Sequence, residues 1–267
     1  MINAVVLYLK FAAMSVRGQI QYRASFLMLT LGSFMITFVE FIAIAALFTR
    51  FGALKGWQLG EAAMCYGLVS ISFGFSEAFG RGFDMFSYQV INGDFDRTLL
   101  RPRSTGLQVL GHDFQLMRFG RMIQGILILV WASGITGIDW SPAKMALLVF
   151  AVTGGVAVFT GLLIIQAAMC FWSTQSLEVM NSFTYGGVEA TQWPLSIFNR
   201  WFGRLFIFVI PLACVNYFPA LAILGKPDVL GSPLWFQWTS PLAGFLFLVV
   251  SLLVWEYGVR HYRSTGS

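Results

Sequence analysis

The stretch from Ala24 to Thr49, ASFLMLTLGSFMITFVEFIAIAALFT, decides the fold class of this 267-residue chain. Glu40 is its one charged residue. Because the hydrocarbon core of a bilayer needs about 20 mostly apolar residues per helix, the stretch predicts a transmembrane helix. It is too long for the apolar part of a cleavable signal peptide, which has about 7–15 residues.

Further apolar runs follow this one. Together they predict six transmembrane helices, near residues 24–48, 59–80, 117–138, 145–171, 201–222 and 238–258. The composition agrees, because 57% of the residues are hydrophobic and 11% are charged, whereas about 25% are charged in soluble domains. No interval between the runs is long enough to build a separate core. We therefore expect an all-α membrane protein with a single domain, residues 1–267.

The lysines and arginines set the orientation, because they are enriched in cytoplasmic connectors. With the N-terminus inside, thirteen of the 17 fall on the inner side and four on the outer side. The inner set is Lys10, Arg17, Arg23, Arg81, Arg97, Arg101, Arg103, Arg118, Arg121, Arg200, Arg204, Arg260 and Arg263. The outer set is Arg50, Lys55, Lys144 and Lys226. This asymmetry predicts an even number of spans with both termini in the cytoplasm, and it explains the net charge of +5 without a nucleic-acid partner.

Residues 1–23 form an amphipathic stretch ahead of the first span. Its apolar face recurs at helical spacing through Val5, Tyr8, Phe11, Ala12 and Ser15. Lys10 and Arg17 lie off that face. Such a pattern predicts a helix lying on the inner membrane surface, with its basic residues toward anionic lipid headgroups. The alternative is a frayed polar tail.

The connector after the second span, FGRGFDMFSYQVINGDFDRTLLRPRS (residues 79–104), is the most charged part of the chain. Within the inner loop 81–112, the spacing of Phe83, Phe86 and Val90 predicts a helix along the membrane surface. Asn92-Gly93 indicates a turn. Asp94 can cap a short helix after it, with Asp96 in the first turn, and Pro102 limits that helix.

Leu99 and Leu100 therefore lie on a short, rigid helix facing the cytoplasm. Docking of this helix into a groove of a cytoplasmic partner would explain two adjacent leucines there. The alternative is that they rest on lipid headgroups, and the residues alone do not separate the two.

The segment INGDFDRTLLRP, Ile91–Pro102, resembles the cytoplasmic loop of ABC-2 type permeases, the membrane subunits of one class of ATP-binding-cassette exporters. Other similar stretches are QYR at 21–23, FWS at 171–173, WPLSIF at 193–198 and IPLACVNYFPALAILG at 210–225. Trp193 departs from the tyrosine expected before the proline. These stretches are spread over nearly the whole chain, in the order and spacing of that family.

The resemblance implies a six-helix permease of the cell membrane, in bacteria the inner membrane. It implies pairing with an identical or related permease and with two cytoplasmic ATPase subunits. The coupling helix would be Ile91–Arg101, and its contacts with the ATPase would be Ile91, Asp94, Phe95, Asp96, Arg97, Leu99, Leu100 and Arg101. The loop Ser173–Arg200 would be a second inner contact.

ATP must then bind elsewhere. A phosphate-binding loop needs the pattern G-x-x-x-x-G-K-[ST]. Lys226 is the one lysine that follows a glycine, and Pro227 stands where the hydroxyl is required. We therefore expect no cofactor in this chain, with ATP and magnesium bound by the ATPase partner.

No pattern indicates catalysis or a resident metal. His112 and His261 are isolated from other ligand-type residues in the sequence. The three cysteines, Cys65, Cys170 and Cys214, lie within apolar runs without CxxC spacing, so we expect buried free thiols. The chain is therefore predicted to be a non-catalytic subunit.

Polar residues within the predicted spans are candidates for the translocation path: Glu40, Gln124 and Gln166. A carboxylate at the depth of Glu40 costs several kcal/mol unless it faces protein or water. It lies ten residues before Arg50, about 15 Å along a helix, so these two cannot pair within one helix. Path lining, a subunit interface and bonding between helices remain open.

Two other functions compete with the ATP-driven exporter. An ion-gradient-driven secondary transporter would need deep ion ligands, of which Glu40 is the one good candidate, and an inverted repeat. A membrane-embedded enzyme would need His, Asp or Glu clustered at one depth. Between the last two spans, the prolines and aromatics of 219–237 suit a half-helix entering the outer leaflet.

Overall fold

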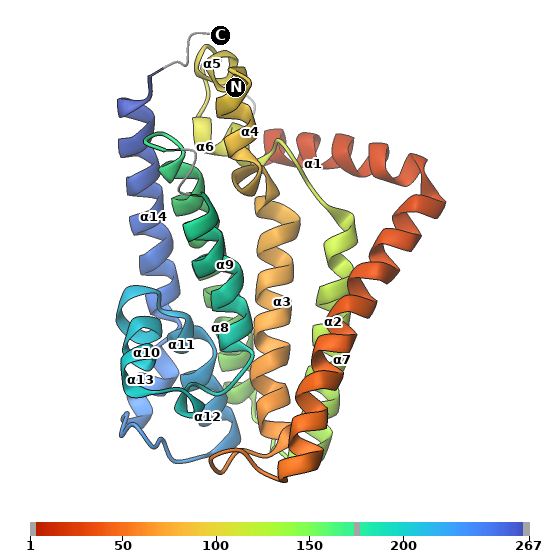
Figure 1. Cartoon of the computed structure of the whole chain (residues 1–267), viewed down its shortest axis with the longest axis vertical. Coiled ribbons are helices and arrows are strands. Elements are labelled where there is room, and N and C mark those ends of the chain that lie inside the picture. Colours follow the sequence, from red (N-terminus) through yellow and green to blue (C-terminus); the bar gives the residue numbers. More distant parts are fainter. Residues whose placement is uncertain (1–3, 174–176, 264–267) are drawn as a thin grey trace.

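The computed structural model describes residues 4–173 and 177–263, which fold into helices around one long axis (Figure 1). The long helices are α1 (Ala4–Gln21), α2 (Arg23–Phe51), α3 (Leu59–Asp84), α7 (Phe119–Thr136), α8 (Pro142–Met169), α9 (Leu177–Thr191) and α14 (Leu242–His261). The short ones are α4 (Phe86–Ile91), α5 (Asp94–Leu99), α6 (Thr105–Leu110), α10 (Arg200–Arg204), α11 (Leu212–Val215), α12 (Tyr217–Leu224) and α13 (Leu234–Thr239). Leu116–Arg118 and Leu195–Ile197 are 3-10 turns, and Leu205–Val209 is π-helical.

Five helical segments are long and apolar enough to cross a membrane. They are α2, α3 with α4, Leu116–Thr136, α8 and α14. These segments match five of the six predicted spans. A sixth is counted if the pair Trp201–Val209 and Leu212–Leu224, bent by 74°, forms one span. The chain is therefore a multi-pass helical membrane protein.

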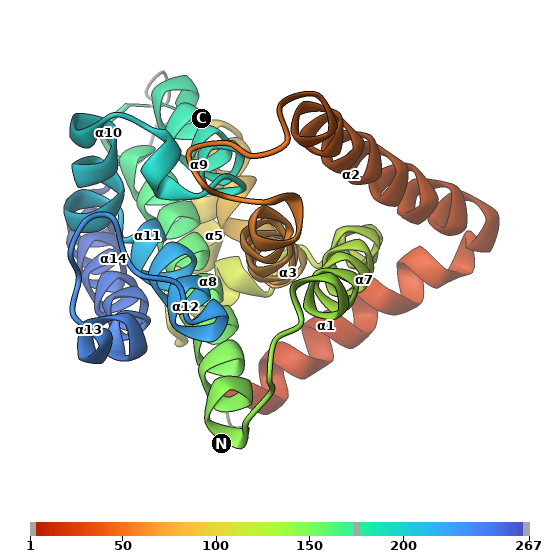
Figure 2. The same cartoon turned by 90° about the horizontal axis from the view of Figure 1, so that it is seen from below.

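Helix α3 is the centre of the bundle and packs on α7 and α8, while α8 also packs on α14. Small residues allow the close approach of α3 to α7. A Cβ on Gly67 would lie 2.9 Å from Leu129 Cβ and 3.1 Å from the Gly125 carbonyl oxygen, so no side chain fits there. Seen from below, α2 and α14 lie on opposite sides of α3 and α8 (Figure 2). Most of the α2 surface is exposed, as suits a helix that faces lipid or another subunit.

The predicted fifth span, 201–222, is wrong. Lys55 donates to the Ile197 carbonyl at 2.9 Å, and Trp57 donates to Ser196 at 2.8 Å. Residues 196–197 therefore lie beside the α2–α3 connector, so the chain has reached that end of the bundle before residue 201. The chain reaches that end through α9. This helix comes after Phe171 in the sequence and before Trp193, whose ring stacks on Phe48 near the end of α2. The loop Ser173–Arg200 is therefore not an inner loop, and its proposed second ATPase contact is lost over most of its length.

The bent pair enters the bundle and leaves it at the same end. Leu212 lies next to Gly187 of α9, and Val215 lies next to Gly154 and Gly155 in the middle of α8. The chain then returns, so that Lys226 pairs with Glu61 at 2.5 Å. The half-helix expected at 219–237 is thus found earlier in the sequence, at 201–224.

This path changes the distribution of the basic residues. Arg204 lines the same cavity as Lys55 and Leu230, so Arg200 and Arg204 belong to the outer set. The split becomes eleven to six in place of thirteen to four. Arginine still predominates at the end of the bundle that holds α5 and the end of α14 (Figure 1). The predicted inner end is therefore the same as before.

The N-terminal stretch is helical, as α1, and turns sharply at Tyr22 into α2. It contacts α3 and the connector before α7. Tyr8 donates to the Phe79 carbonyl at 3.3 Å, and Ser15 donates to the Phe114 carbonyl at 3.0 Å. Burial raises the pKa of Tyr8 to about 12, so its hydroxyl remains a donor. In Figure 1, α1 lies across the end of the bundle rather than along it.

Candidate functional site

The first candidate site is the α4–α5 unit, which continues α3 beyond a break at Met85. Phe83, Phe86 and Val90 are buried against α8 and α14. The prediction that they form a helix along the membrane surface is therefore wrong, because their shared face packs on protein and extends the bundle. Gly93, with φ of 71°, makes the turn and is itself the N-cap residue of α5, so Asp94 occupies the first turn and does not cap the helix.

An aromatic cluster fixes α5 to the bundle. The Phe95 side chain is fully buried. Its ring centroid lies 4.9 Å from that of Phe86, 5.1 Å from Tyr262, 5.5 Å from Phe171 and 6.2 Å from Trp255. Edge-to-face pairs of this kind add to the energy of burial. A six-residue helix with little stability of its own is thereby held rigid.

The other face of α5 is open. Ile91 is 56% exposed, Leu99 40% and Leu100 85%. Asp94, Arg97 and Arg101 are also exposed, and the Asp94–Arg97 pair at 3.7 Å is solvated on both sides, so it contributes little. Most residues of the predicted contact set are thus exposed, and Asp96 is partly exposed. Phe95 is the correction, because its side chain offers no surface to a partner and serves instead as the anchor.

The second candidate site is a cavity of about 460 Å³ between α2, α3, α7 and α9. Apolar residues such as Met28 and Ile36 form one side. The charged side is a chain of ion pairs that crosses three helices: Arg118–Glu77 at 3.2 Å, Arg121–Glu77 at 3.7 Å and Arg121–Glu40 at 3.4 Å. Tyr185 and Glu189 of α9 complete the lining.

Glu40 therefore lines a cavity within the bundle, and its partner is Arg121 rather than Arg50. Glu77 is almost fully buried, and it is not among the residues that the sequence singles out. The signal that would have found it is the spacing of Arg118 and Arg121, three residues apart on one helical face.

Gln124 and Gln166 do not line this cavity. Both are buried. Gln124 donates to the Thr37 carbonyl at 3.1 Å and to the Tyr66 hydroxyl at 3.2 Å. Both residues bond neighbouring helices, and their role in a path stays a prediction.

Gln166 belongs to a network around Asp84, the last residue of α3. Asp84 accepts from Gln166 at 2.9 Å, from Tyr185 at 3.2 Å and from Arg81. Gln166 in turn accepts from Thr184 at 3.2 Å. Asp84 thus joins α3, α8 and α9 two residues before the α4–α5 unit begins. Sequence reasoning missed it, because Asp84 lies in a loop-like charged segment and its partners are distant along the chain.

Within the described ranges, no group of three or more His, Cys, Asp or Glu side chains is placed to hold a metal ion. The three cysteines are free and buried.

A sequence model of the family described as "ABC-2 family transporter protein" matches residues 34–266 of the chain. The match begins within α2 and extends past the last described residue, and it includes the α4–α5 unit and the charged side of the cavity. No individually curated protein and no solved structure matches the chain significantly.

Proposed function

Since the chain belongs to the ABC-2 transporter family, as a membrane subunit of an ABC transporter, we propose that it is the permease of an ATP-driven exporter whose α4–α5 unit docks on separate cytoplasmic ATPase subunits. Two ATPase copies, which bind ATP and magnesium, and a second permease, identical or related, would complete the transporter. Both termini would lie in the cytoplasm.

One observation carries the proposal. The α5 helix is fixed from behind by Phe95, while Leu99 and Leu100 stand exposed on its outer side. Removing the exposed leucine side chains from water would be favourable. A helix that is anchored to the bundle can transmit force without deforming. Insertion of such apolar residues into a groove of a partner is a general mode of helix recognition.

The Asp84 network gives a physical route from this surface to the cavity. A displacement of α4–α5 acts on the end of α3, where Asp84 is bonded to Gln166 of α8 and Tyr185 of α9. Tyr185 also lines the cavity with Glu40 and Glu77. Motion of the docked helix would therefore shift α9 relative to α2 and α3, and rigid-body shifts of this kind can open a path alternately to either side.

The cavity also raises the secondary-transporter alternative again, because three carboxylates lie there. Glu40 and Glu77 are paired with arginines, however, and membership of the ABC-2 family favours ATP as the energy source. The exporter remains our proposal.

Co-purification tests it. Affinity-tagged chain is purified from its own membranes, and ATPase subunits are detected by magnesium-dependent ATP hydrolysis and mass spectrometry. Leu100→Asp should lower the recovered ATPase at least about tenfold, since a charge would enter an apolar contact. Val229→Asp is the matched control, because Val229 is 80% exposed at the other end of the bundle. Equal recovery with both variants would reject the docking surface, and hydrolysis by the chain purified alone would reject the proposal altogether.

A further inference from the structure

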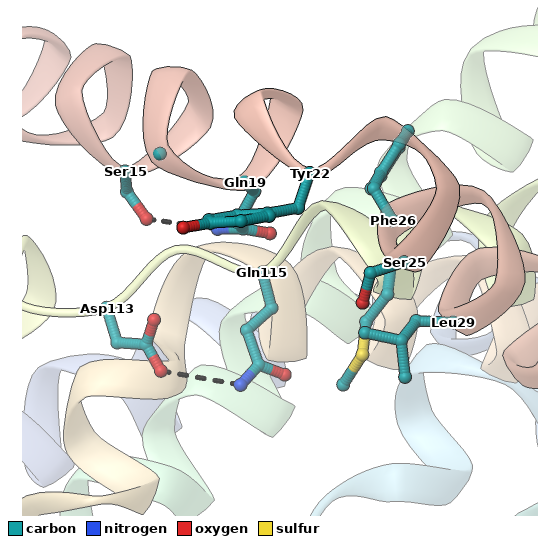
Figure 3. Close-up of a pocket in the computed structure, with 10 residues that line it drawn as sticks. Ser15, Gln19, Tyr22, Ser25, Phe26, Leu29, Asp113 and Gln115 are labelled. Atoms are coloured by element: carbon teal, nitrogen blue, oxygen red, sulfur yellow. Dashed lines mark hydrogen bonds between the residues drawn. The ribbon is translucent and has the colours of Figure 1, made fainter.

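A cavity of about 630 Å³ lies in the elbow between α1 and α2. Figure 3 shows its arrangement: Ser15 and Gln19 of α1, with Tyr22 of the turn between α1 and α2, face Asp113 and Gln115 of the connector before α7, and Ser25, Phe26 and Leu29 of α2 close one side. None of these residues belongs to the α4–α5 unit. We call this cavity the elbow pocket.

The elbow pocket is held open by bonds at its back. Gln19 donates to the Phe114 carbonyl, and its own carbonyl accepts from the Leu116 amide at 3.0 Å. Ser15 donates to the Phe114 carbonyl as well. These bonds tie α1 to the connector, so the space beside them is preformed and does not depend on a ligand.

The lining is divided by polarity. Phe26, Leu29 and Met117 form an apolar part, beginning one turn into α2, the first membrane-crossing helix. Ser15, Gln19 and Asp113 form a polar part at the level of α1. A molecule that fits must therefore have an apolar body toward the bilayer and a polar end toward the water.

The charges specify the polar end. Asp113 is the charged residue that lines the pocket. Its contact there is with the Gln115 amide at 3.4 Å, and none of the salt bridges among the described residues includes it. The Tyr22 ring, 69% exposed, supplies an aromatic surface that attracts cations.

We propose that the elbow pocket binds an inner-leaflet phospholipid with an ammonium headgroup, such as phosphatidylethanolamine. The ammonium group pairs with Asp113, and the acyl chains lie against Phe26, Leu29 and Met117. Leu29 and Met117 also line the charged cavity between α2 and α9, so the lipid lies beside that cavity. This inference rests on the proposed orientation, which puts α1 at the inner membrane surface.

Photolabelling in nanodiscs tests the proposal. The probes are phosphatidylethanolamine and phosphatidylglycerol, each with a diazirine in the upper acyl chain, and labelled peptides are identified by mass spectrometry. Peptides 15–29 and 113–117 should take up the ethanolamine lipid about fivefold more than the glycerol lipid, as one partly screened ion pair allows. The exposed face of α14 around Leu246 and Val250 is the internal reference and should show no preference.

Two variants separate charge from shape. Asp113→Asn should reduce the ethanolamine labelling to the glycerol level, whereas Asp139→Asn, in the exposed connector between α7 and α8, should not. Gly18→Leu should reduce labelling by both lipids, because Gly18 lines the pocket and has nothing within 4 Å of an added Cβ. Equal labelling by the two lipids, or an unchanged preference in Asp113→Asn, would overturn the proposal.

Recovery of the ATPase from the same membranes keeps the two proposals apart. Loss of the lipid preference with the ATPase still bound contradicts the lipid site alone. A retained preference in a chain that recovers no ATPase supports the lipid site and contradicts the proposed function.

Discussion

Replacing Phe95 with alanine should release α5 from the bundle while leaving the rest of the protein folded. The phenyl ring is fully buried, and four aromatic rings lie within 6.2 Å of its centroid. Removal of a buried phenylalanine side chain costs about 3–5 kcal/mol. The loss is expected to be local, because Phe95 is the buried side chain of α5.

The expected magnitude follows from that energy. If about 3–4 kcal/mol of the docking energy of α5 is lost, amide hydrogen exchange in residues 94–99 should become about 10²–10³ times faster. Protection in α3 and α8 should hardly change. Exchange measured by mass spectrometry in nanodiscs resolves these segments.

Leu100→Ala is the matched comparison. Its side chain is 85% exposed, so the substitution should change stability by less than about 0.5 kcal/mol and leave the exchange of α5 as in the wild type. Both variants should recover less ATPase, but for different reasons. If Phe95→Ala leaves the protection of α5 intact, the assignment of Phe95 as the anchor is incorrect.

Three further predictions concern the network, a packing contact and a titration. Asp84→Asn should lower the free energy of unfolding by about 1–3 kcal/mol, because the donors Gln166 and Tyr185 lose a charged acceptor. Asp139→Asn is the exposed control. Equal thermal midpoints for the two variants in detergent would contradict the network. Gly82→Ala should lower the yield of folded protein, because its Cβ would lie 1.7 Å from a backbone oxygen, whereas Gly18→Ala, in open space, should stabilise α1 by up to about 1 kcal/mol. Burial raises the pKa of Tyr8 from 10.0 to about 12, so between these values the folded state keeps a proton that the unfolded state loses. The stability contributed by Tyr8 therefore falls as the pH rises from 10 to 12. The phenolate absorbance lost in Tyr8→Phe should have its midpoint near the higher pKa, and a midpoint near the lower pKa would show that the hydroxyl is exposed.

The coupling surface illustrates how far sequence reasoning reaches. The turn at Asn92-Gly93 and the short helix after it follow from local chemistry. The burial of Phe95 does not, because it depends on Phe171 and Trp255, which lie far away along the chain. A list of apolar residues in a loop cannot tell which of them face outward.

The charged cavity shows the same limit. Glu40 stood out because a carboxylate within an apolar run is costly and needs a partner. The identity of the partner, Arg121, and the inclusion of Glu77 depend on how α2, α3 and α7 pack. Gln124 and Gln166 looked equivalent to Glu40 in the sequence, but their amides are satisfied by neighbouring helices.

Sequence alone determined that this protein is a helical membrane protein, because runs such as Ala24–Thr49 can be satisfied only by lipid, and it located five of the crossing helices. Only the tertiary structure decided that the chain passes through the bundle by α9, while the more apolar segment 201–224 turns back. The physical reason is that the hydropathy of a segment indicates an apolar environment, but does not tell whether that environment is lipid or protein. Polar side chains of α9 bond to Gln166 and Asp84 within the protein, whereas α11 and α12 are apolar because protein surrounds them.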